Sequence, residues 1–509
     1  MEKKEIVSYL MEKDVLVSPE LLEKLENVSL DQIKNLSDEE LLVYGKDAEQ
    51  LIGQNLEWKE IDKSKSILEK EGGEKDYTSY VQKKEVKSNS QVNVKFSYNL
   101  EPKKRKLKDF VDLFNARYAS MEKLLSKRME ISNLTSISRL KNKKDRDNVS
   151  LIAMVSEKRT TKNGNLMIVV EDPTGTTNVL VNKNKPELFN EAKDIVLDEV
   201  IAVNGVSGDN IIFANTVLWP EVPLTKELKK IDEEVYAVFL SDLHIGSTNF
   251  LPKDFDKFLS WMNGEVGNDT QKAVASKIKY AFIVGDLVDG CGIYPGQDEE
   301  LSIKDINEQY NVCARLLKKI PGHVEIIVCP GNHDAMRIAE PQPPLYKDFA
   351  GQLYDLPNVT MVSNPAMINI HASENFSGFD VLMYHGYSFD YFVANVDSIR
   401  NKGGYDRGDL IMKFLLKRRH LAPTHTSTLY LPQNEDALVI NDIPDIFVTG
   451  HIHKSIAANY RNVTLISGSC WQSKTDFQEK VGHNPEPSRV PIVNLKTRKV
   501  KILRFGGNE

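Results

Sequence analysis

Short apolar runs dominate the second half of the chain, and each ends on polar side chains beside a glycine. In VYAVFLSDLHIGS (235–247), six mostly apolar residues lead almost directly to Asp242 and His244. An apolar run of this length without polar alternation predicts a strand buried on both faces of a sheet. The pattern recurs in KYAFIVGDLVDG, HVEIIVCPGNHD, GFDVLMYHG and IPDIFVTGHIHK. We therefore expect a layered α/β domain over residues 235–509.

The pattern before residue 235 is different. Residues 1–50 have helical periodicity, as in SPELLEKLEN, and predict a small helical docking domain. Residues 51–105 are poor in apolar side chains and rich in Lys, Glu, Ser and Asn, which predicts a flexible linker. The segment LKDFVDLFNARYASMEKLLSKRM then predicts an amphipathic helix. Its expected apolar face consists of Leu107, Phe110, Val111, Phe114, Tyr118, Met121, Leu125 and Met129.

A run of short strands follows this helix, with turn signals at Asn163-Gly164 and Pro173-Thr174-Gly175. About five strands with one helical insert, KPELFNEAKDI, predict a β barrel of the oligonucleotide-binding (OB) type within residues 106–225. Phe213 and Trp219 are its chief candidates for stacking on nucleic-acid bases. Because this aromatic platform is small, we favour a protein-interface role for the barrel slightly over nucleic-acid binding.

The pattern predicts a multidomain α/β and β architecture, and the composition limits the number of domains and the class of binding partner. The chain has 509 residues, 41% hydrophobic and 27% charged, as is typical of a globular protein of two or three domains. A formal net charge of −7 argues against a protein that coats nucleic acid without sequence preference. Basic clusters occur at 102–108, 139–146 and 417–420. We interpret them as solvated surface, with phosphate contact as the less favoured alternative.

The sequence contains no uninterrupted run of apolar residues long enough to span a membrane, and its first residues lack the apolar core of a secretion signal. The four cysteines are scattered without a CxxC pair, which disfavours a disulfide framework and a zinc ribbon. Both observations predict a cytoplasmic protein.

Metal-binding residue types stand at the ends of the predicted strands, which meet at one edge of an α/β sheet. Their number exceeds what one tetrahedral ion can use and suits two ions. Imidazole combined with carboxylate favours Mn, with Fe or Zn as alternatives, over Ca or Mg. The absence of cysteine disfavours a structural zinc site. The expected donors are Asp242, His244, Asp286, Asn332, His385, His451 and His453. The remaining histidines, His323, His371, His420, His425 and His483, fall outside the pattern.

The motifs DxH, GDxxD, GNHD, HG and GHxH, in this order, resemble those of the calcineurin-like metallophosphoesterase superfamily over about residues 235–509. The resemblance implies a two-layered β sandwich flanked by helices. It also implies one metal held by Asp242, His244 and His453, a second held by Asn332, His385 and His451, and Asp286 bridging them. His333 would face the scissile phosphate, with Asp289 or Asp334 orienting its ring.

Two differences from the Ser/Thr phosphatase motifs, together with the order of the domains along the chain, narrow the type of phosphoesterase. GDLVDGC lacks the arginine of the Ser/Thr phosphatase branch, and GNHD replaces its GNHE. The order of helix, barrel and phosphoesterase, ending in GSCWQSKTDFQEKVGHNPEPSRVPIVNL, resembles the small-subunit family of archaeal D-family DNA polymerases over residues 105–509. This resemblance implies a subunit with 3′–5′ exonuclease activity on single-stranded DNA ends or primer-template. It also implies a heterodimer or heterotetramer with a large polymerase subunit.

Two alternatives remain open from the sequence. One is a catalytically silent scaffold subunit, although retention of every expected metal ligand favours activity. The other is a stand-alone phosphoesterase acting on small nucleotides. The residues themselves indicate phosphoester hydrolysis, whereas the direction of degradation comes only from the resemblance.

Overall fold

A computed structural model describes residues 92–99, 103–140, 146–480 and 482–507. The chain divides into two units, 1–80 and 81–509, and all described residues belong to the second. The predicted helical domain (1–50) and most of the predicted linker therefore lie outside the described residues. Among the described helices, none combines the length and apolar character needed to cross a bilayer.

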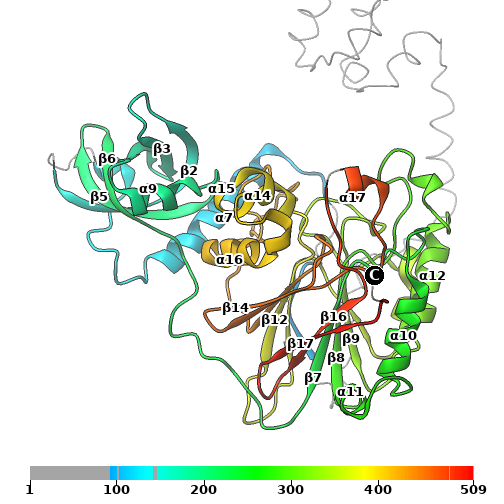
Figure 1. The fold of residues 1–509 in the computed structure, drawn as a ribbon. Helices are drawn as coiled ribbons and strands as arrows, with labels where there is room; N and C mark the ends of the chain where they lie inside the picture. The colour runs from blue at the N-terminus through cyan, green and yellow to red at the C-terminus, as the bar shows by residue number, and fades with distance from the viewer. Residues whose placement is uncertain (1–91, 100–102, 141–145, 481, 508–509) are drawn as a thin grey trace, which may run out of the picture. The chain divides into compact units, whose positions relative to one another are not determined.

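Two six-stranded sheets form the centre of the part of the described chain that lies outside the barrel (Figure 1). The first has the order β10-β9-β8-β7-β16-β17, with bounds Val359–Met361, Glu325–Cys329, Ile278–Val284, Tyr236–Leu240, Arg489–Asn494 and Val500–Arg504. The second has the order β1-β11-β12-β13-β15-β14, with bounds Val92–Ser97, Ala366–Ile370, Phe379–Met383, Ile446–Thr449, Val463–Ser467 and Ile456–Tyr460. The five apolar runs of the sequence form β7, β8, β9, β12 and β13, as predicted.

The two sheets pack face to face, and helices cover their outer faces. Phe239 and Phe282 of the first sheet stack at 5.2 Å and share a core with Val381 and Ile446 of the second. Residues of α10 (Pro252–Met262), α11 (Asp269–Ala275), α12 (Ile306–Leu317) and α13 (Lys347–Tyr354) pack on the first sheet. Residues of α14 (Phe389–Asn395), α15 (Asp397–Arg400) and α16 (Gly408–Arg418) pack on the second (Figure 1). Helices on both sides explain why the central strands are apolar on both faces.

Strand β1 corrects part of the linker prediction. Val92–Ser97 lies inside residues 51–105 but pairs antiparallel with β11, from Val92 opposite Ile370 to Ser97 opposite Ala366. Most of its side chains are exposed, so it has little of the apolar signal by which a strand is recognised. Backbone pairing with the open edge of the sheet forms this strand.

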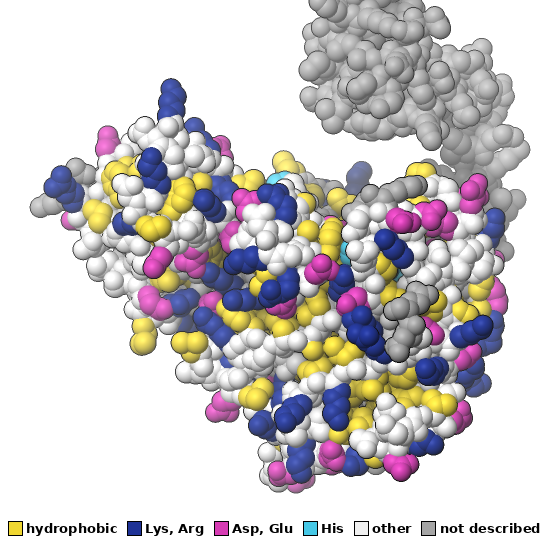
Figure 2. Space-filling model, viewed as in Figure 1, with side chains coloured by type: hydrophobic (Ala, Val, Ile, Leu, Met, Phe, Trp, Pro, Cys, Tyr) yellow, Lys and Arg dark blue, Asp and Glu magenta, His cyan; other side chains and the backbone are white. Residues whose placement is uncertain are grey.

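The predicted five-stranded barrel is present and closes in the order β2-β3-β4-β6-β5. Its strands are Asn148–Thr160, Leu166–Asp172, Gly175–Val181, Val200–Gly208 (β5) and Ile211–Leu218 (β6). The predicted helical insert is α9 (Pro186–Lys193), between β4 and β5. Short helix α8 (Ile137–Leu140) contacts β4. Figure 2 shows basic and acidic side chains interspersed over the visible face of the described part.

Helix α7 (Leu107–Leu125) forms where predicted, but its buried face differs from the expected one. Leu113, Arg117, Met121 and Leu125 are buried, whereas Leu107 is 82% exposed. Phe110, Val111 and Met129, also expected on the apolar face, are exposed. The helix therefore turns a stripe containing an arginine inward, because partners are available there for the guanidinium.

Those partners form a charged junction, which we define as Arg117, Glu199, Arg418, His420 and Asp436. Arg117 Nε donates to Asp436 Oδ2 at 2.7 Å, and His420 Nε2 lies 2.9 Å from the same oxygen. Arg418, at the end of α16, pairs with Glu199 next to β5 and so joins the two-sheet region to the barrel. This finding corrects the surface interpretation of 417–420, because Arg418, Arg419 and His420 are buried.

Candidate metal centre

The donor residues at the strand ends share an unusual backbone conformation. Asp242, His244, Asp286, His451 and His453 all have positive φ angles, between 50° and 68°. Asp, Asn and His adopt this left-handed region more often than other non-glycine residues, but it is sparsely populated. Each such residue costs about 1–3 kcal/mol and persists only where its surroundings impose it. The strand ends therefore hold these side chains in strained turns directed at a common point.

Glycines beside the donors allow the turns to approach one another closely. A Cβ atom on Gly331 would lie 2.3 Å from Asp286 Oδ1, and one on Gly450 would lie 2.6 Å from Asp242 Oδ2. Both contacts are shorter than any real packing distance for a side-chain carbon. The glycines of the GNHD and GHxH motifs are thus required by the approach of two strand ends to buried carboxylates.

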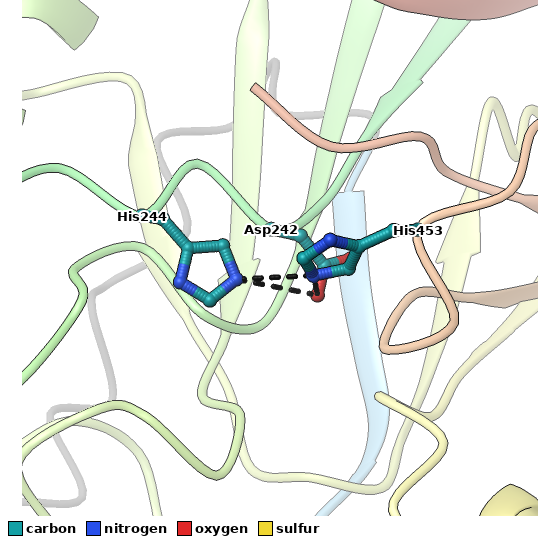
Figure 3. A group of neighbouring side chains, drawn as sticks. All are labelled: Asp242, His244 and His453. Atoms are coloured by element: carbon teal, nitrogen blue, oxygen red, sulfur yellow. Dashed lines mark hydrogen bonds and ion pairs between the residues drawn. The ribbon is translucent and has the colours of Figure 1, made fainter. Parts of the chain in front are cut away.

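A first donor group consists of Asp242, His244 and His453, whose ligand atoms all lie within 4.8 Å of one another (Figure 3). His244 Nε2 and His453 Nε2 are 3.1 Å apart. Asp242 Oδ1 lies 3.4 Å from His453 Nε2 and 4.0 Å from His244 Nε2. All three residues are buried, so three converging donors meet away from solvent.

A second donor group consists of Asp286, His385 and His451, with ligand atoms again within 4.8 Å. Asn332 Oδ1 lies 3.0 Å from His385 Nε2 and so joins this group. Asp286 Oδ2 lies 3.3 Å from His385 Nε2 and 3.9 Å from His244 Nε2, which places one carboxylate between the two groups. All seven donors expected from the sequence are thus brought together.

Each imidazole of the site has one nitrogen facing the donors and another held by an outer partner. His385 Nδ1 donates to the Val284 carbonyl at 2.9 Å, and His451 Nε2 donates to Asp390 Oδ2 at 3.0 Å. His453 Nδ1 lies 3.0 Å from Gln478 Nε2. For His385 and His451, the oxygen acceptor on the outer nitrogen fixes the tautomer that leaves the inner nitrogen free to bind a cation. Asp390 and Gln478 were not expected from the sequence, since neither belongs to a strand-end motif.

The electrostatics of the site favour a bound cation. Burial opposes ionisation of Asp286, but His385 and His333 outweigh it and hold the pKa of Asp286 well below its usual range. Burial likewise opposes protonation of His385, but the Asp286 carboxylate prevails and raises the pKa of His385 to about 10. His385 therefore takes up a proton that compensates the buried Asp286 carboxylate. A divalent ion would supply the same positive charge and displace that proton, so the donor set fits Mn, Fe or Zn.

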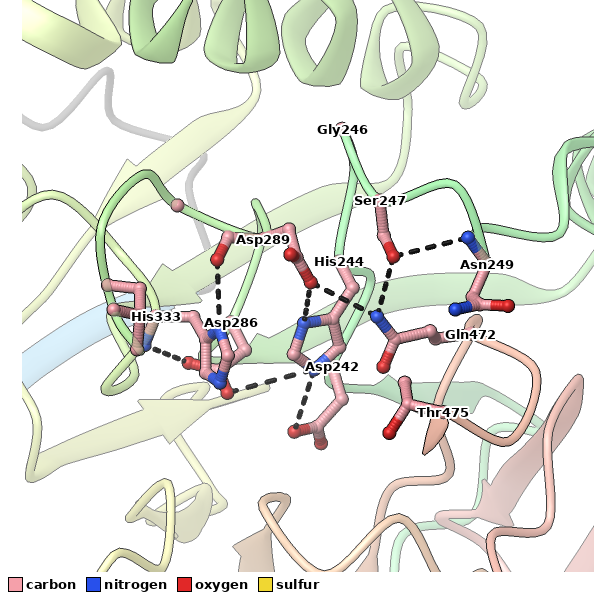
Figure 4. A network of polar contacts seen from close by, with 12 residues as sticks. Asp242, His244, Gly246, Ser247, Asn249, Asp286, Asp289, His333, Gln472 and Thr475 are labelled. Atoms are coloured by element: carbon pink, nitrogen blue, oxygen red, sulfur yellow. Dashed lines mark hydrogen bonds and ion pairs between the residues drawn. The ribbon is translucent and has the colours of Figure 1, made fainter. Parts of the chain in front are cut away.

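His333 lies beside this cluster, with its ring centroid 4.7 Å from that of His244. Its Nδ1 donates to the backbone carbonyl of Asp289 at 2.8 Å. The Asp289 carboxylate instead accepts from His244 Nδ1 at 3.0 Å. Asp289 thus contacts His333 through its main chain, whereas its side chain orients a donor of the first group (Figure 4).

Asp334 has other contacts. Its carboxylate accepts from the Gly331 backbone N–H at 2.8 Å and from the Tyr310 hydroxyl at 3.0 Å. No bond to the His333 ring is found among the described residues. Burial raises the pKa of Asp334 to about 7. Asp334 therefore shapes the GNHD turn, and its expected role in orienting His333 has no direct contact to support it.

The histidines expected outside the site lie mostly elsewhere. His371 Nδ1 is hydrogen-bonded to the Tyr280 hydroxyl, and His425 Nδ1 to the Asp198 carboxylate. His420 belongs to the charged junction. His323 is exposed. His483 differs, because its ring lies 6.4 Å from that of His453 and 5.0 Å from that of Tyr405, at the border of the first donor group.

Comparisons with known proteins identify relatives of this chain. The model of the B-subunit family of DNA polymerases alpha and epsilon matches residues 237–457. The DNA polymerase II small subunit of Methanothermobacter thermautotrophicus is 40% identical over 398 residues, which are 78% of this chain and 79% of that protein. The protein of the same name from Archaeoglobus fulgidus is 39% identical over 403 residues, 79% of this chain and 78% of its own length.

Coverage differs among the relatives. The DNA polymerase II small subunit of Pyrococcus abyssi is 40% identical over 402 residues, but these are 78% of this chain and only 63% of that protein. A solved archaeal phosphodiesterase is 11% identical over 53% of this chain and 99% of that chain, with a TM-score of 0.26. A likeness that weak carries no argument about function.

Proposed function

This chain belongs to the family of archaeal DNA polymerase II small subunits, and from that premise we propose that it hydrolyses phosphodiester bonds at single-stranded 3′ ends of DNA. The polymerase reaction would be carried out by a separate large subunit, bound in a cytoplasmic heterodimer or heterotetramer. In this proposal the small subunit supplies the 3′–5′ exonuclease of a replicative polymerase.

The observation that carries the proposal is the shared position of Asp286. One carboxylate faces both donor groups, and His333 lies beside them. Its Nδ1 is hydrogen-bonded, and no hydrogen bond is found for its Nε2 among the described residues. A pair of divalent ions, Mn in the first place, would supply charge neutralisation and a water that is deprotonated near neutral pH. Asp242, His244 and His453 would hold one ion, Asn332, His385 and His451 the other, and Asp286 both.

His333 has the remaining task, which is to protonate the leaving oxygen. Its Nδ1 is committed to the Asp289 carbonyl, so Nε2 is the nitrogen that would face the scissile phosphate. Burial lowers the pKa of His333 below 6.5. The ring would therefore gain its proton when the anionic phosphodiester lies beside it, because a nearby negative charge favours the imidazolium.

The barrel is better suited to protein contact than to base stacking. Trp219, one of its two aromatic candidates, is 2% exposed and donates from Nε1 to Glu199. Phe213 is exposed, but single-strand platforms stack successive bases on several aromatic rings. We infer that the barrel contributes to assembly with the large subunit and that DNA affinity comes mainly from the complex.

The test is His333→Ala in the purified complex with its large subunit, assayed with Mn²⁺ on single-stranded DNA labelled at its 5′ or 3′ end. Loss of a general acid lowers the rate by about 10²–10⁴-fold. The 5′-labelled strand should shorten progressively in the wild type, while the 3′ label should be released as mononucleotide at once. His323→Ala, an exposed histidine outside the site, is the matched control and should retain activity.

Two outcomes would contradict the proposal. Unchanged degradation by His333→Ala would place the nuclease elsewhere in the complex and leave this chain a scaffold. Turnover of a cyclic dinucleotide by the chain alone, together with no cleavage of DNA in the complex, would make it a stand-alone phosphoesterase.

A further inference from the structure

Gln297 contacts the centre of the site from a loop that no strand-end motif includes. It begins a short 3₁₀ helix, η4 (Gln297–Glu299), between β8 and α12, and its side chain is only 1% exposed. Its amide nitrogen Nε2 lies 2.8 Å from the backbone carbonyl of Asp289 and 2.9 Å from Asp289 Oδ2. Its Oε1 accepts from the Ile293 N–H at 2.9 Å, which fixes the orientation of the amide.

Gln297 holds two groups of Asp289, the backbone carbonyl and the carboxylate, the latter through Oδ2, and these two groups serve two different histidines. The Asp289 carbonyl accepts from His333 Nδ1, and the Asp289 carboxylate accepts from His244 Nδ1 through Oδ1. Each oxygen fixes a tautomer: one directs His333 Nε2 outward, and the other directs His244 Nε2 toward Asp242. A single amide group therefore positions the acceptors of a metal-ligand candidate and of the proposed acid.

Gln472 contacts the same carboxylate in a simpler way. Its Nε2 donates to Asp289 Oδ1 at 3.1 Å and to Ser247 Oγ at 2.8 Å (Figure 4). It is 5% exposed, so its burial matches that of Gln297. No contact with the Asp289 carbonyl is found for Gln472 among the described residues. Both glutamines thus donate to the Asp289 carboxylate, but only Gln297 also donates to the Asp289 carbonyl.

We propose that Gln297 is a positioning residue that couples the two parts of the site by orienting His244 and His333 together through Asp289. Gln472 acts on His244 alone. The effect of Gln297 on the rate of hydrolysis rests on the proposed function, whereas its effect on the orientation of His244 and His333 does not. Without the Gln297 amide, the Asp289 carboxylate loses a donor in a buried position. The peptide that accepts from His333 loses the donor on its carbonyl and keeps only the bond from Gly290 N–H to Gln309 Oε1.

The test compares Gln297→Met with Gln472→Met, because methionine keeps the length of the side chain and removes its polar atoms. Mn²⁺ affinity of the full chain is measured by calorimetry. Both substitutions should weaken it by about 10–100-fold, the usual effect of losing an outer partner of a metal-bound histidine. Thermal midpoints of both metal-free variants that match the wild type would show that neither change simply unfolds the chain.

The difference between the variants is then measured at saturating Mn²⁺ with two phosphodiesters. Thymidine 5′-(p-nitrophenyl phosphate) releases a stable phenolate without a proton, whereas DNA releases an alkoxide that needs one. Gln297→Met should lower the rate on DNA about tenfold more than the rate on the activated ester, within the range of general acid catalysis. Gln472→Met should lower both rates by the same factor. An equal ratio of rates in the two variants would overturn the coupling.

A spectroscopic readout separates this inference from the proposed function. In ¹⁵N-histidine spectra of the metal-free chain, Gln297→Met should change the ring signals of both His244 and His333, and Gln472→Met only those of His244. Unchanged His333 signals in Gln297→Met would overturn the inference whatever the enzyme activity. If the wild type cleaves neither phosphodiester but the spectra change as stated, the proposed function fails and the positioning role stands.

Discussion

The charged junction and the candidate metal centre are both buried clusters of ionisable groups, but they compensate charge in different ways. In the junction, each carboxylate faces a guanidinium: Asp436 is paired with Arg117 and Glu199 with Arg418. At the metal centre, the carboxylates of Asp242, Asp286 and Asp289 face imidazoles. A guanidinium keeps its charge at any pH that the folded protein experiences, whereas an imidazole holds a proton that a metal ion can displace.

This difference separates a cluster whose charges are paired within the protein from one whose donors fit a cation. The junction is complete without any ligand and joins α7, α16 and the barrel. At the metal centre, the proton on His385 compensates the Asp286 carboxylate, and a bound cation would displace that proton. Burial of charge is therefore uninformative by itself, and the nature of the compensating group indicates which cluster has a chemical role.

The largest expected effect on stability comes from breaking the junction. Arg117→Met removes the guanidinium and leaves the buried Asp436 carboxylate with His420 and the Leu438 N–H, but without its permanent positive charge. This should destabilise the fold by about 3–5 kcal/mol. Thermal unfolding should show the same loss with Mn²⁺ and with EDTA, because the junction holds no cation. The matched control is Lys277→Met, which removes an exposed pair with Glu234 and should cost at most about 1 kcal/mol. A loss that depended on Mn²⁺ would contradict the separation of the two clusters.

A smaller effect is expected from pH, and it should appear only at the metal centre. The folded pKa of His385, about 10, lies above its ordinary value of 6.5. Its contribution to stability is therefore fully present below pH 6.5 and is lost as the pH rises through 10. The metal-free chain should lose thermal stability between pH 7 and 9, and His385→Gln should lose less over the same range. Equal slopes in the two proteins would contradict the assignment.

The charged junction should not contribute to the loss of thermal stability between pH 7 and 9. Burial would raise the pKa of Asp436, but Arg117 outweighs it and holds the pKa below the ordinary value of 3.8. Its contribution is present above pH 3.8 and is lost as the pH falls further. With Mn²⁺ bound, the alkaline loss should also diminish, because the ion replaces the proton on His385.

The sequence predicted the strand ends well because each carries its own local signal. An apolar run, a glycine and a donor side chain occur within a dozen residues, as around Asp242 and Asp286. Parallel pairing brings the donors of β7, β8 and β9 to one edge of the first sheet and those of β12 and β13 to one edge of the second. The two edges converge because the two sheets pack face to face, which differs from the single sheet edge expected from the sequence. The closed barrel was also predicted, from strand length and turn residues alone.

Features that depend on distant partners were missed. Arg117 and Arg418 have the sequence signature of solvated residues, and they are buried because Asp436 and Glu199 meet them from segments far along the chain. The same holds for Gln297, whose importance arises only when its loop folds back on Asp289. Strand β1 was missed because its pairing with β11 is made by backbone groups, which carry no residue-specific signal.

The smallest expected effect concerns the barrel and tests whether its exposed aromatic residue contributes to DNA binding. Phe213, 48% exposed, is the candidate stacking residue that remains once Trp219 is buried beside Glu199. A base stacked on an aromatic ring contributes about 1–3 kcal/mol, so a true platform would lose roughly tenfold or more in affinity on Phe213→Ala. We expect less than about twofold, measured by fluorescence anisotropy of single-stranded DNA on the complex, because stacking needs several rings in succession. A tenfold loss would move DNA binding onto the barrel and make its interface role secondary.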